Sequence, residues 1–120
     1  MTHTLSETEL EKIHSVARAI EKNIRAHYTI PELASMAYLN DYQLKKSFKQ
    51  VYGMGPYAYL LQQRLEKAKA LLLEDKPIRN IGLNIGFTGR HAQTNFIKFF
   101  KKEMKVSPAV WKKQQWQQTG

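Results

Sequence analysis

The chain has 120 residues, enough for one compact domain or two very small ones that share an element. It contains no cysteine, which excludes disulfides, thiol catalysis and thiolate metal sites. The formal net charge of +9 is uneven: residues 1–40 carry four basic and five acidic side chains, residues 41–75 six and four, and residues 76–113 nine and one. Such concentration favours a polyanionic partner (nucleic acid, an anionic membrane or an acidic protein), although basic side chains that merely solvate the surface explain it equally well.

Neither a targeting segment nor a membrane span is expected. The first 20 residues lack an apolar stretch after a basic start, so they do not form a signal peptide. No run approaches the ~18 apolar residues that cross a bilayer. The four histidines are scattered without the spacing of a metal site, and no cofactor is expected. We expect a soluble, cytoplasmic protein.

The first predicted helix covers residues 6–27. Ser6 and Glu9 have the spacing of a capping box, which satisfies the first backbone N–H groups of a helix. Apolar residues then follow at steps of three and four, as on one face of a helix. We expect this face to be core: Leu10, Ile13, Ala17, Ile20 and Ile24.

Two shorter helices follow. A second capping box, over residues 29–32, opens a helix of about two turns. Asn40, with Gln43 three residues later, caps the next helix. That helix is predicted to run to about Tyr52 and to stop at Gly53.

The remaining pattern is also helical. Residues 56–75 contain strong helix formers and no breaker after the first turn, which predicts a helix about 28 Å long. A short helix over 77–85, a long one over about 91–104 and a final turn over 107–111 follow, and residues 114–120 are expected to be a frayed polar tail. No alternating pattern of a strand occurs, so the predicted fold class is all-α.

Part of the chain occurs twice. Residues of the first half return 52 positions later: Phe48-Lys49, Pro56 and Tyr59 as Phe100-Lys101, Pro108 and Trp111. Upstream, Leu33-Ala34 and Leu39 return 48 positions later as Ile81-Gly82 and Phe87. Each copy reads as short helix, turn and longer helix, which is helix-turn-helix spacing. Neither copy can bury a core alone, so we expect one domain with units at 6–55 and 76–113, joined by a linker helix at 56–75.

The longer helix of each copy has one apolar and one polar side. In the first copy, the residues expected to face inward are Leu44, Phe48 and Val51, and those facing outward are Tyr42, Lys45, Lys46 and Lys49. In the second copy, Phe96 and Phe100 face inward, and Thr94, Lys98 and Lys101 face outward between Gln93 and Asn95. Lysines and amides on a helix of this length suit the major groove of duplex DNA.

The ordered set of motifs resembles the DNA-binding domain of AraC/XylS-type transcription regulators over about Ile13 to Lys113. It comprises Ile30-Pro31-Glu32-Leu33-Ala34, Leu44-x-x-x-Phe48-Lys49, Tyr59, Arg64-Leu65-Glu66-Lys67-Ala68, Leu71-Leu72, Ile78-x-x-Ile81, Gly86-Phe87, Phe96-x-x-x-Phe100-Lys101-Lys102 and Pro108-x-x-Trp111. The resemblance implies two recognition helices, at about 40–52 and 91–104, in successive major grooves of duplex DNA. Those grooves lie about 34 Å apart, which a linker helix of about 28 Å plus its ends can span.

The resemblance also implies which residues contact DNA. Its base-reading positions correspond here to Tyr42, Lys45, Lys46, Gln93, Thr94, Asn95 and Lys98. Lysines can donate to guanine, amides can bond an adenine edge, and a tyrosine ring can pack on a thymine methyl. Phosphate contacts, which position without specifying, are assigned to Asn40, Gln43, Lys49, Arg90, His91, Lys101 and Lys102.

Two departures from the family pattern stand in the second unit. Phe87 precedes Phe96 by nine positions where the family has six, so three extra residues fall near Thr88–His91. A longer turn absorbed by Gly89, or a re-aimed helix with added backbone contacts from Arg90 and His91, both explain them. Lys105 stands where a glycine commonly ends the helix in the family.

The predicted function is sequence-specific DNA binding by a transcription regulator, an activator by resemblance, with RNA polymerase as a further partner. A non-specific basic or protein-binding module with a degenerate second unit is the alternative. No catalytic constellation occurs, and the cysteine-dependent DNA repair of one subgroup is excluded. No effector or dimerisation domain fits into residues 1–29, so the chain is either a stand-alone regulator or a C-terminal fragment.

We also predict where three aromatic side chains outside these sets pack. Tyr38 and Tyr52 are expected at the edge of the core. Phe99 is expected to pack on Trp111, with an exposed contact to a partner protein as the alternative.

Overall fold

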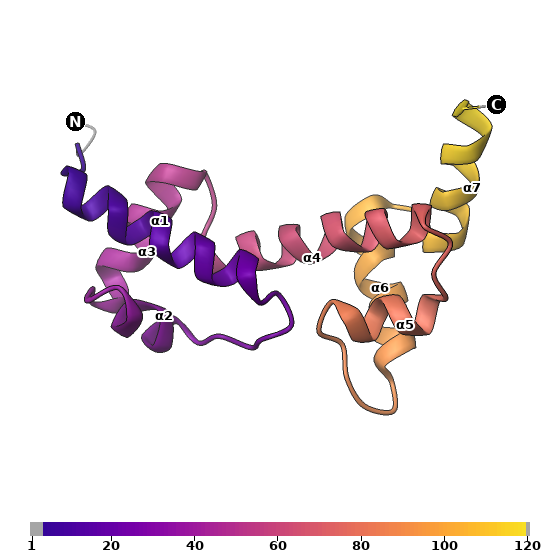
Figure 1. Cartoon of the computed structure of the whole chain (residues 1–120), viewed down its shortest axis with the longest axis horizontal. Helices are drawn as coiled ribbons and strands as arrows, with labels where there is room; N and C mark the ends of the chain where they lie inside the picture. Colours follow the sequence, from indigo (N-terminus) through magenta and orange to yellow (C-terminus); the bar gives the residue numbers. More distant parts are fainter. Residues whose placement is uncertain (1–3, 120) are drawn as a thin grey trace. The chain divides into compact units, whose positions relative to one another are not determined.

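The computed structural model describes residues 4–119, and the regular structure in that range is entirely helical (Figure 1). This confirms the all-α fold class. Residues 1–3 and Gly120, the end of the expected tail, lie outside the described part. The helices are α1 (Glu7–Lys22), α2 (Ile30–Met36), α3 (Asp41–Tyr52), α4 (Pro56–Leu73), α5 (Ile78–Asn84), α6 (Ala92–Met104) and α7 (Pro108–Thr119).

The chain divides into two compact units inside α4. Unit 1 is Met1–Gln63 and unit 2 is Arg64–Gly120. Each unit contains a short helix, a turn and a longer helix: α2 and α3 in unit 1, α5 and α6 in unit 2. The two helix-turn-helix arrangements predicted from the repeat are therefore present.

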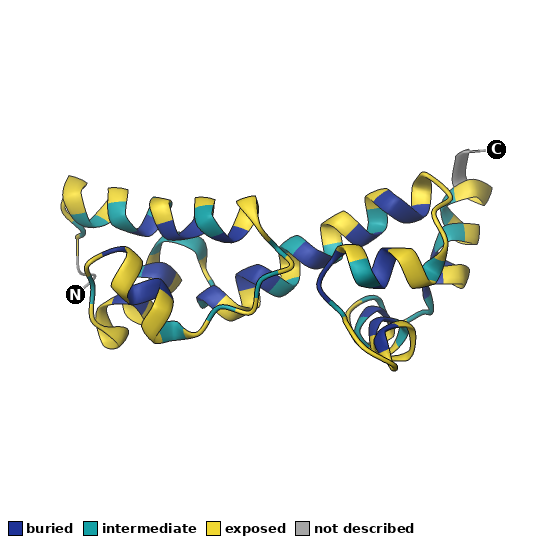
Figure 2. Ribbon diagram, turned by 60° about the horizontal axis from the view of Figure 1, so that its bottom comes forward, coloured by how far each residue is buried: buried dark blue, intermediate teal, exposed yellow. Residues whose placement is uncertain are grey.

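The core of unit 1 is formed by one face of α1 together with α2, α3 and the start of α4. Along α1 the buried residues follow one side of the helix and the exposed residues the other (Figure 2). The expectation for Leu10 was wrong: it is 37% exposed, because it lies one turn before Ile13, where the buried stretch of α1 begins. The predicted extension of α1 to residue 27 was also wrong, since Asn23 leaves the helical conformation with φ −145° and ψ 79°.

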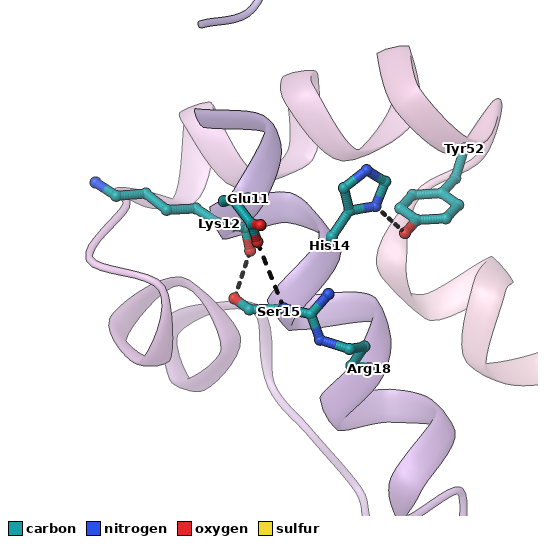
Figure 3. Close-up of polar contacts among 6 residues, drawn as sticks. All are labelled: Glu11, Lys12, His14, Ser15, Arg18 and Tyr52. Carbon is teal, nitrogen blue, oxygen red and sulfur yellow. Dashed lines mark hydrogen bonds and ion pairs between the residues drawn. The ribbon is translucent and has the colours of Figure 1, made fainter. Parts of the chain in front are cut away.

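Polar contacts fasten α1 to the helices packed against it. His14 Nδ1 lies 2.7 Å from the Tyr52 hydroxyl at the end of α3 (Figure 3). The Tyr52 ring stacks on Phe48 with centroids 4.7 Å apart. The Tyr59 hydroxyl of α4 donates to Glu21 Oε1 of α1 at 2.5 Å. Burial and this hydrogen bond raise the pKa of Tyr59. The Tyr59 ring contacts α3 through Phe48 and Tyr52, with centroids 5.4 Å and 5.0 Å away.

The core of unit 2 is built from the apolar side of α6. Phe96 and Phe100 are fully buried, and the Phe100 ring meets Trp111 of α7 edge-on with centroids 5.9 Å apart. Phe99 does not pack on Trp111 as expected. Its ring lies 5.5 Å from that of Phe87, because Phe99 is on the side of α6 that faces the turn after α5.

Two further helix ends differ from the sequence-based expectation. The helix α4 ends at Leu73, two residues early, and Asp75 adopts a left-handed φ of 62°. The helix α7 continues to Thr119 through the segment expected to be a frayed tail. Its Lys112 pairs with Asp75 and lies 4.7 Å from the Trp116 ring centroid, which ties α7 to the end of α4 and to its own next turn.

Candidate nucleic-acid interface

The helix α3 begins and ends at the residues that the sequence indicates. Asn40 Oδ1 accepts from the Gln43 N–H at 2.8 Å, and Gln43 Oε1 accepts from the Asn40 N–H at 3.0 Å, so the capping box is complete. Gly53 closes the helix with φ 77°. The oxygens of both side chains accept the cap hydrogen bonds, and their NH₂ groups point away from the cap bonds as donors that a phosphate can accept from.

One side of α3 is buried and the other is exposed, as predicted. Leu44 and Phe48 are fully buried, whereas the Tyr42 side chain is 70% exposed. The Lys46 ammonium lies 5.7 Å from the centre of the Tyr42 ring, within range of a cation–π interaction. The other residues assigned to DNA contact in this unit, Lys45 and Lys49, are also exposed.

A shallow hollow of about 260 Å³ adjoins this exposed side of α3. Its lining residues are Glu9, Leu39, Tyr42, Gln43, Lys46 and Ser47. Lysine, tyrosine and amide groups that can contact base edges and phosphates therefore come together on one surface of unit 1, beside the carboxylate of Glu9.

The helix α6 repeats this division in unit 2. Phe96 and Phe100 are buried. The residues assigned to DNA contact on this helix are all exposed: Gln93, Thr94, Asn95, Lys98, Lys101 and Lys102. Thr94, Lys98 and Lys101 lie on the side of α6 opposite its phenylalanines, and the exposed amides of Gln93 and Asn95 lie at the start of the helix.

The three extra residues of the second unit lie in its turn. Four residues separate α2 from α3 (37–40), and seven separate α5 from α6 (85–91). Gly86 and Gly89 adopt φ values of 113° and 84°, which glycine reaches without a Cβ clash. The turn of unit 2 is therefore longer than that of unit 1 by three residues, and Phe96 and Phe100 are nevertheless buried.

The lengthened turn also changes the start of α6. His91 is the N-cap but makes no side-chain cap hydrogen bond, in contrast to Asn40. Arg90 and His91 are exposed beside the first turn of α6. Two further donors are thereby added to this end of the recognition helix.

The positive net charge of the chain lies almost entirely in unit 2. Residues 1–63 carry seven basic and six acidic side chains, a balance of +1, and residues 64–120 carry twelve and four, a balance of +8. Within residues 4–119 no group of three or more metal-ligating side chains occurs. In that same range no helix has the length and apolarity to span a membrane.

Tyr38 is an exposed residue that the sequence analysis misplaced. It was expected at the edge of the core, but its side chain is 87% exposed and its φ is 56°. It occupies the turn between α2 and α3, and the repeat places Gly86 at the same position of unit 2. That correspondence could have revealed the positive φ of Tyr38, but Gly86 is itself buried, so no signal in the sequence reveals the exposure of the Tyr38 ring.

Two helix-turn-helix units with exposed basic recognition helices define a double helix-turn-helix DNA-binding domain. Comparison with known proteins supports this assignment to a class of DNA-binding domain. The model of a protein family described as a helix-turn-helix domain matches residues 33–114. The chain belongs to this AraC/XylS-type helix-turn-helix family.

Individual relatives support the same assignment. The chain is 30% identical over 105 residues to the probable transcriptional regulator LumQ of Photobacterium leiognathi, with 85% of this chain and 41% of LumQ covered. It is 31% identical over 103 residues to the HTH-type transcriptional regulator MtrA of Neisseria gonorrhoeae, with 84% and 33% covered. The chain thus spans roughly a third to two fifths of the length of these relatives.

One solved structure is similar to this chain in fold and in length. It is a transcriptional regulator of Chromobacterium violaceum, described as containing an AraC-type DNA-binding domain. The TM-score is 0.75 at 26% identity, with 91% of this chain and 96% of that chain covered.

Proposed function

We propose that this chain reads duplex DNA as part of a transcription activator, with α3 and α6 each entering a major groove. The observation that carries the proposal is the shared division of both helices. A fully buried apolar side fixes each helix in its unit, and an exposed side presents lysine, amide and tyrosine groups. A helix held in this way can enter a groove without unfolding its unit.

The two helices offer different chemistry to base edges. Lys45 and Lys46 of α3 are donors, which suits guanine O6 and N7, and Tyr42 supplies an apolar ring for a thymine methyl. Gln93 and Asn95 of α6 can both donate and accept, which suits adenine. The chain therefore favours an asymmetric site, in which one box is read by α3 and a different box by α6.

Selection of bound duplexes from a randomised DNA pool tests this reading. Selection at ~150 mM salt suppresses binding through phosphates alone. Enrichment of two different boxes about one helical turn apart supports two base-reading units. A single enriched box means that α6 does not read bases, and no enrichment favours a non-specific basic module.

Substitution of one lysine in each class separates base reading from phosphate contact. Lys46→Ala should weaken the selected site by ~1–3 kcal/mol and relax base choice in the α3 box only. Lys101→Ala should weaken all sequences alike and lower the slope of log K against log salt by about one. Titration of both variants on the selected duplex and a scrambled duplex measures the difference, and equal losses on both duplexes would contradict the division of roles.

Activation and the wider context of the domain belong to the same proposal. An activator also contacts RNA polymerase, and the matched relatives are longer than this chain. We propose that the chain acts either alone or as the DNA-binding part of a longer regulator with a separate effector or dimerisation domain. In vitro transcription from a promoter that carries the selected site tests the activator role, and unchanged or reduced transcript would oppose it.

A further inference from the structure

The two recognition helices end in the same backbone conformation but with different residues. Gly53 follows α3 with φ 77° and Lys105 follows α6 with φ 68°, and the repeat of 52 positions pairs them. Each donates its N–H at 2.8 Å to the carbonyl four residues earlier, on Lys49 and Lys101. The backbone geometry is therefore duplicated, and only the side chain is new.

Lysine is an unfavourable choice for this conformation. A Cβ in the left-handed region approaches the neighbouring carbonyl oxygen, and glycine avoids that contact at no cost. Lys105 is also exposed, so its side chain does not compensate by filling the core. Strained residues of this kind cluster at functional sites, so an exposed one is a candidate for a functional role.

The position of Lys105 on α6 indicates the role of its side chain. Exposed residues follow α6 at steps of four, three and four, which places them along one side of the helix: Thr94, Lys98, Lys101 and Lys105. The Lys105 ammonium bends back to donate to the Lys102 carbonyl at 3.1 Å, so it remains at the end of this side. Like charges three and four residues apart on a helix repel each other and cost stability unless an anion lies across them.

We propose that Lys105 is a phosphate-contacting residue, and that the lysine-bearing end of α6 is the main electrostatic anchor of the domain on DNA. The proposal rests on the DNA-binding function proposed above. It agrees with the charge balance of +8 in residues 64–120 against +1 in residues 1–63. Lys105 positions α6 and contributes no base choice, because phosphate contacts are independent of sequence.

The substitution Lys105→Gly separates phosphate contact from strain, because it should change stability and binding in opposite directions. Relief of the left-handed strain should raise the Tm by roughly 4 °C. Loss of one phosphate contact should lower the salt slope by about 0.9, which corresponds to a roughly fivefold weaker affinity at ~150 mM salt. The loss should be equal on the selected and the scrambled duplex.

Two control variants are matched to this substitution. Lys105→Arg keeps both the charge and the strain, so its slope and affinity should equal those of the unsubstituted chain. Lys67→Gln removes an exposed charge from α4, outside the recognition helices, and should leave the slope unchanged. If Lys67→Gln lowers the slope as much as Lys105→Gly does, the effect is one of total charge and the proposal is wrong.

The outcomes distinguish this inference from the proposed function. If the unsubstituted chain binds duplex DNA in a salt-dependent way and Lys105→Gly has a smaller salt slope, the proposed function and the role of Lys105 are both supported. Normal binding of the unsubstituted chain with an unchanged slope for Lys105→Gly overturns only the role of Lys105, and a lower Tm in that variant would assign the side chain to capping α6. An unsubstituted chain that does not bind duplex DNA overturns the proposed function itself.

Discussion

Alanine at Gly82 tests how closely α5 approaches α6 in unit 2. A Cβ at Gly82 would lie 3.1 Å from Phe96 Cβ and 3.4 Å from the Ala92 carbonyl oxygen. The second atom belongs to the α6 backbone and the first is bonded directly to it, so neither can move aside by a change of rotamer. The two helices would have to separate by a few tenths of an ångström.

Two opposing terms determine the stability of Gly82→Ala. Alanine is favoured over glycine inside a helix by about 1 kcal/mol. Overpacking a filled core costs about 1–3 kcal/mol, and Phe96 is fully buried at this contact. The steric cost should prevail, so we expect the free energy of unfolding to fall by about 1 kcal/mol.

Urea unfolding followed by circular dichroism measures this difference. Ala70→Gly, at an exposed position of α4, calibrates the helix-propensity term in the same chain and should cost about 1 kcal/mol. If Ala70→Gly behaves in this way but Gly82→Ala is more stable than the unsubstituted chain, α5 and α6 have room for a methyl group. The steric explanation for glycine at position 82 would then be refuted.

Two further substitutions probe unit 1. Asn40→Ala should cost about 1 kcal/mol in urea unfolding because it removes the α3 cap, and Asn40→Ser should restore most of it; equal losses would contradict a capping role. Burial and Glu21 raise the pKa of Tyr59 in the folded chain, so its contribution to stability is complete below pH ~10 and is lost as the pH rises through the folded pKa. Tyr59→Phe should therefore flatten the alkaline decline in stability above pH ~10, and an unchanged decline would exclude Tyr59 as its source.

The sequence predicted best those features that depend on local chemistry. The start of α3 follows from Asn40 and Gln43, which are three residues apart, and its end follows from Gly53. The buried sides of α3 and α6, with Leu44, Phe48, Phe96 and Phe100, follow from the helical period. For this reason the sequence also predicted which residues of the candidate interface face solvent.

The errors arose where the outcome depends on how far a neighbouring element reaches. The period places Leu10 on the same face as Ile13 but does not show that burial along α1 begins only at Ile13. Phe99 pairs with Phe87 because the turn after α5 passes along that side of α6, and no local pattern contains this information. The length of α7 depends on contacts such as that between Lys112 and Asp75, which are 37 positions apart.

Comparison of the two units shows where stability does not explain the sequence. Positions 38 and 86 both have positive φ, as do positions 53 and 105, and glycine is the least strained residue at all four. Unit 2 has glycine at 86 and lysine at 105, whereas unit 1 has tyrosine at 38 and glycine at 53. Of these paired positions, each unit therefore has one that is not glycine, before the recognition helix in unit 1 and after it in unit 2. In unit 1, Tyr38 adds an exposed aromatic ring before α3. In unit 2, Lys105 adds a charge after α6. The two units thus repeat the same backbone conformations but have chemically different surfaces.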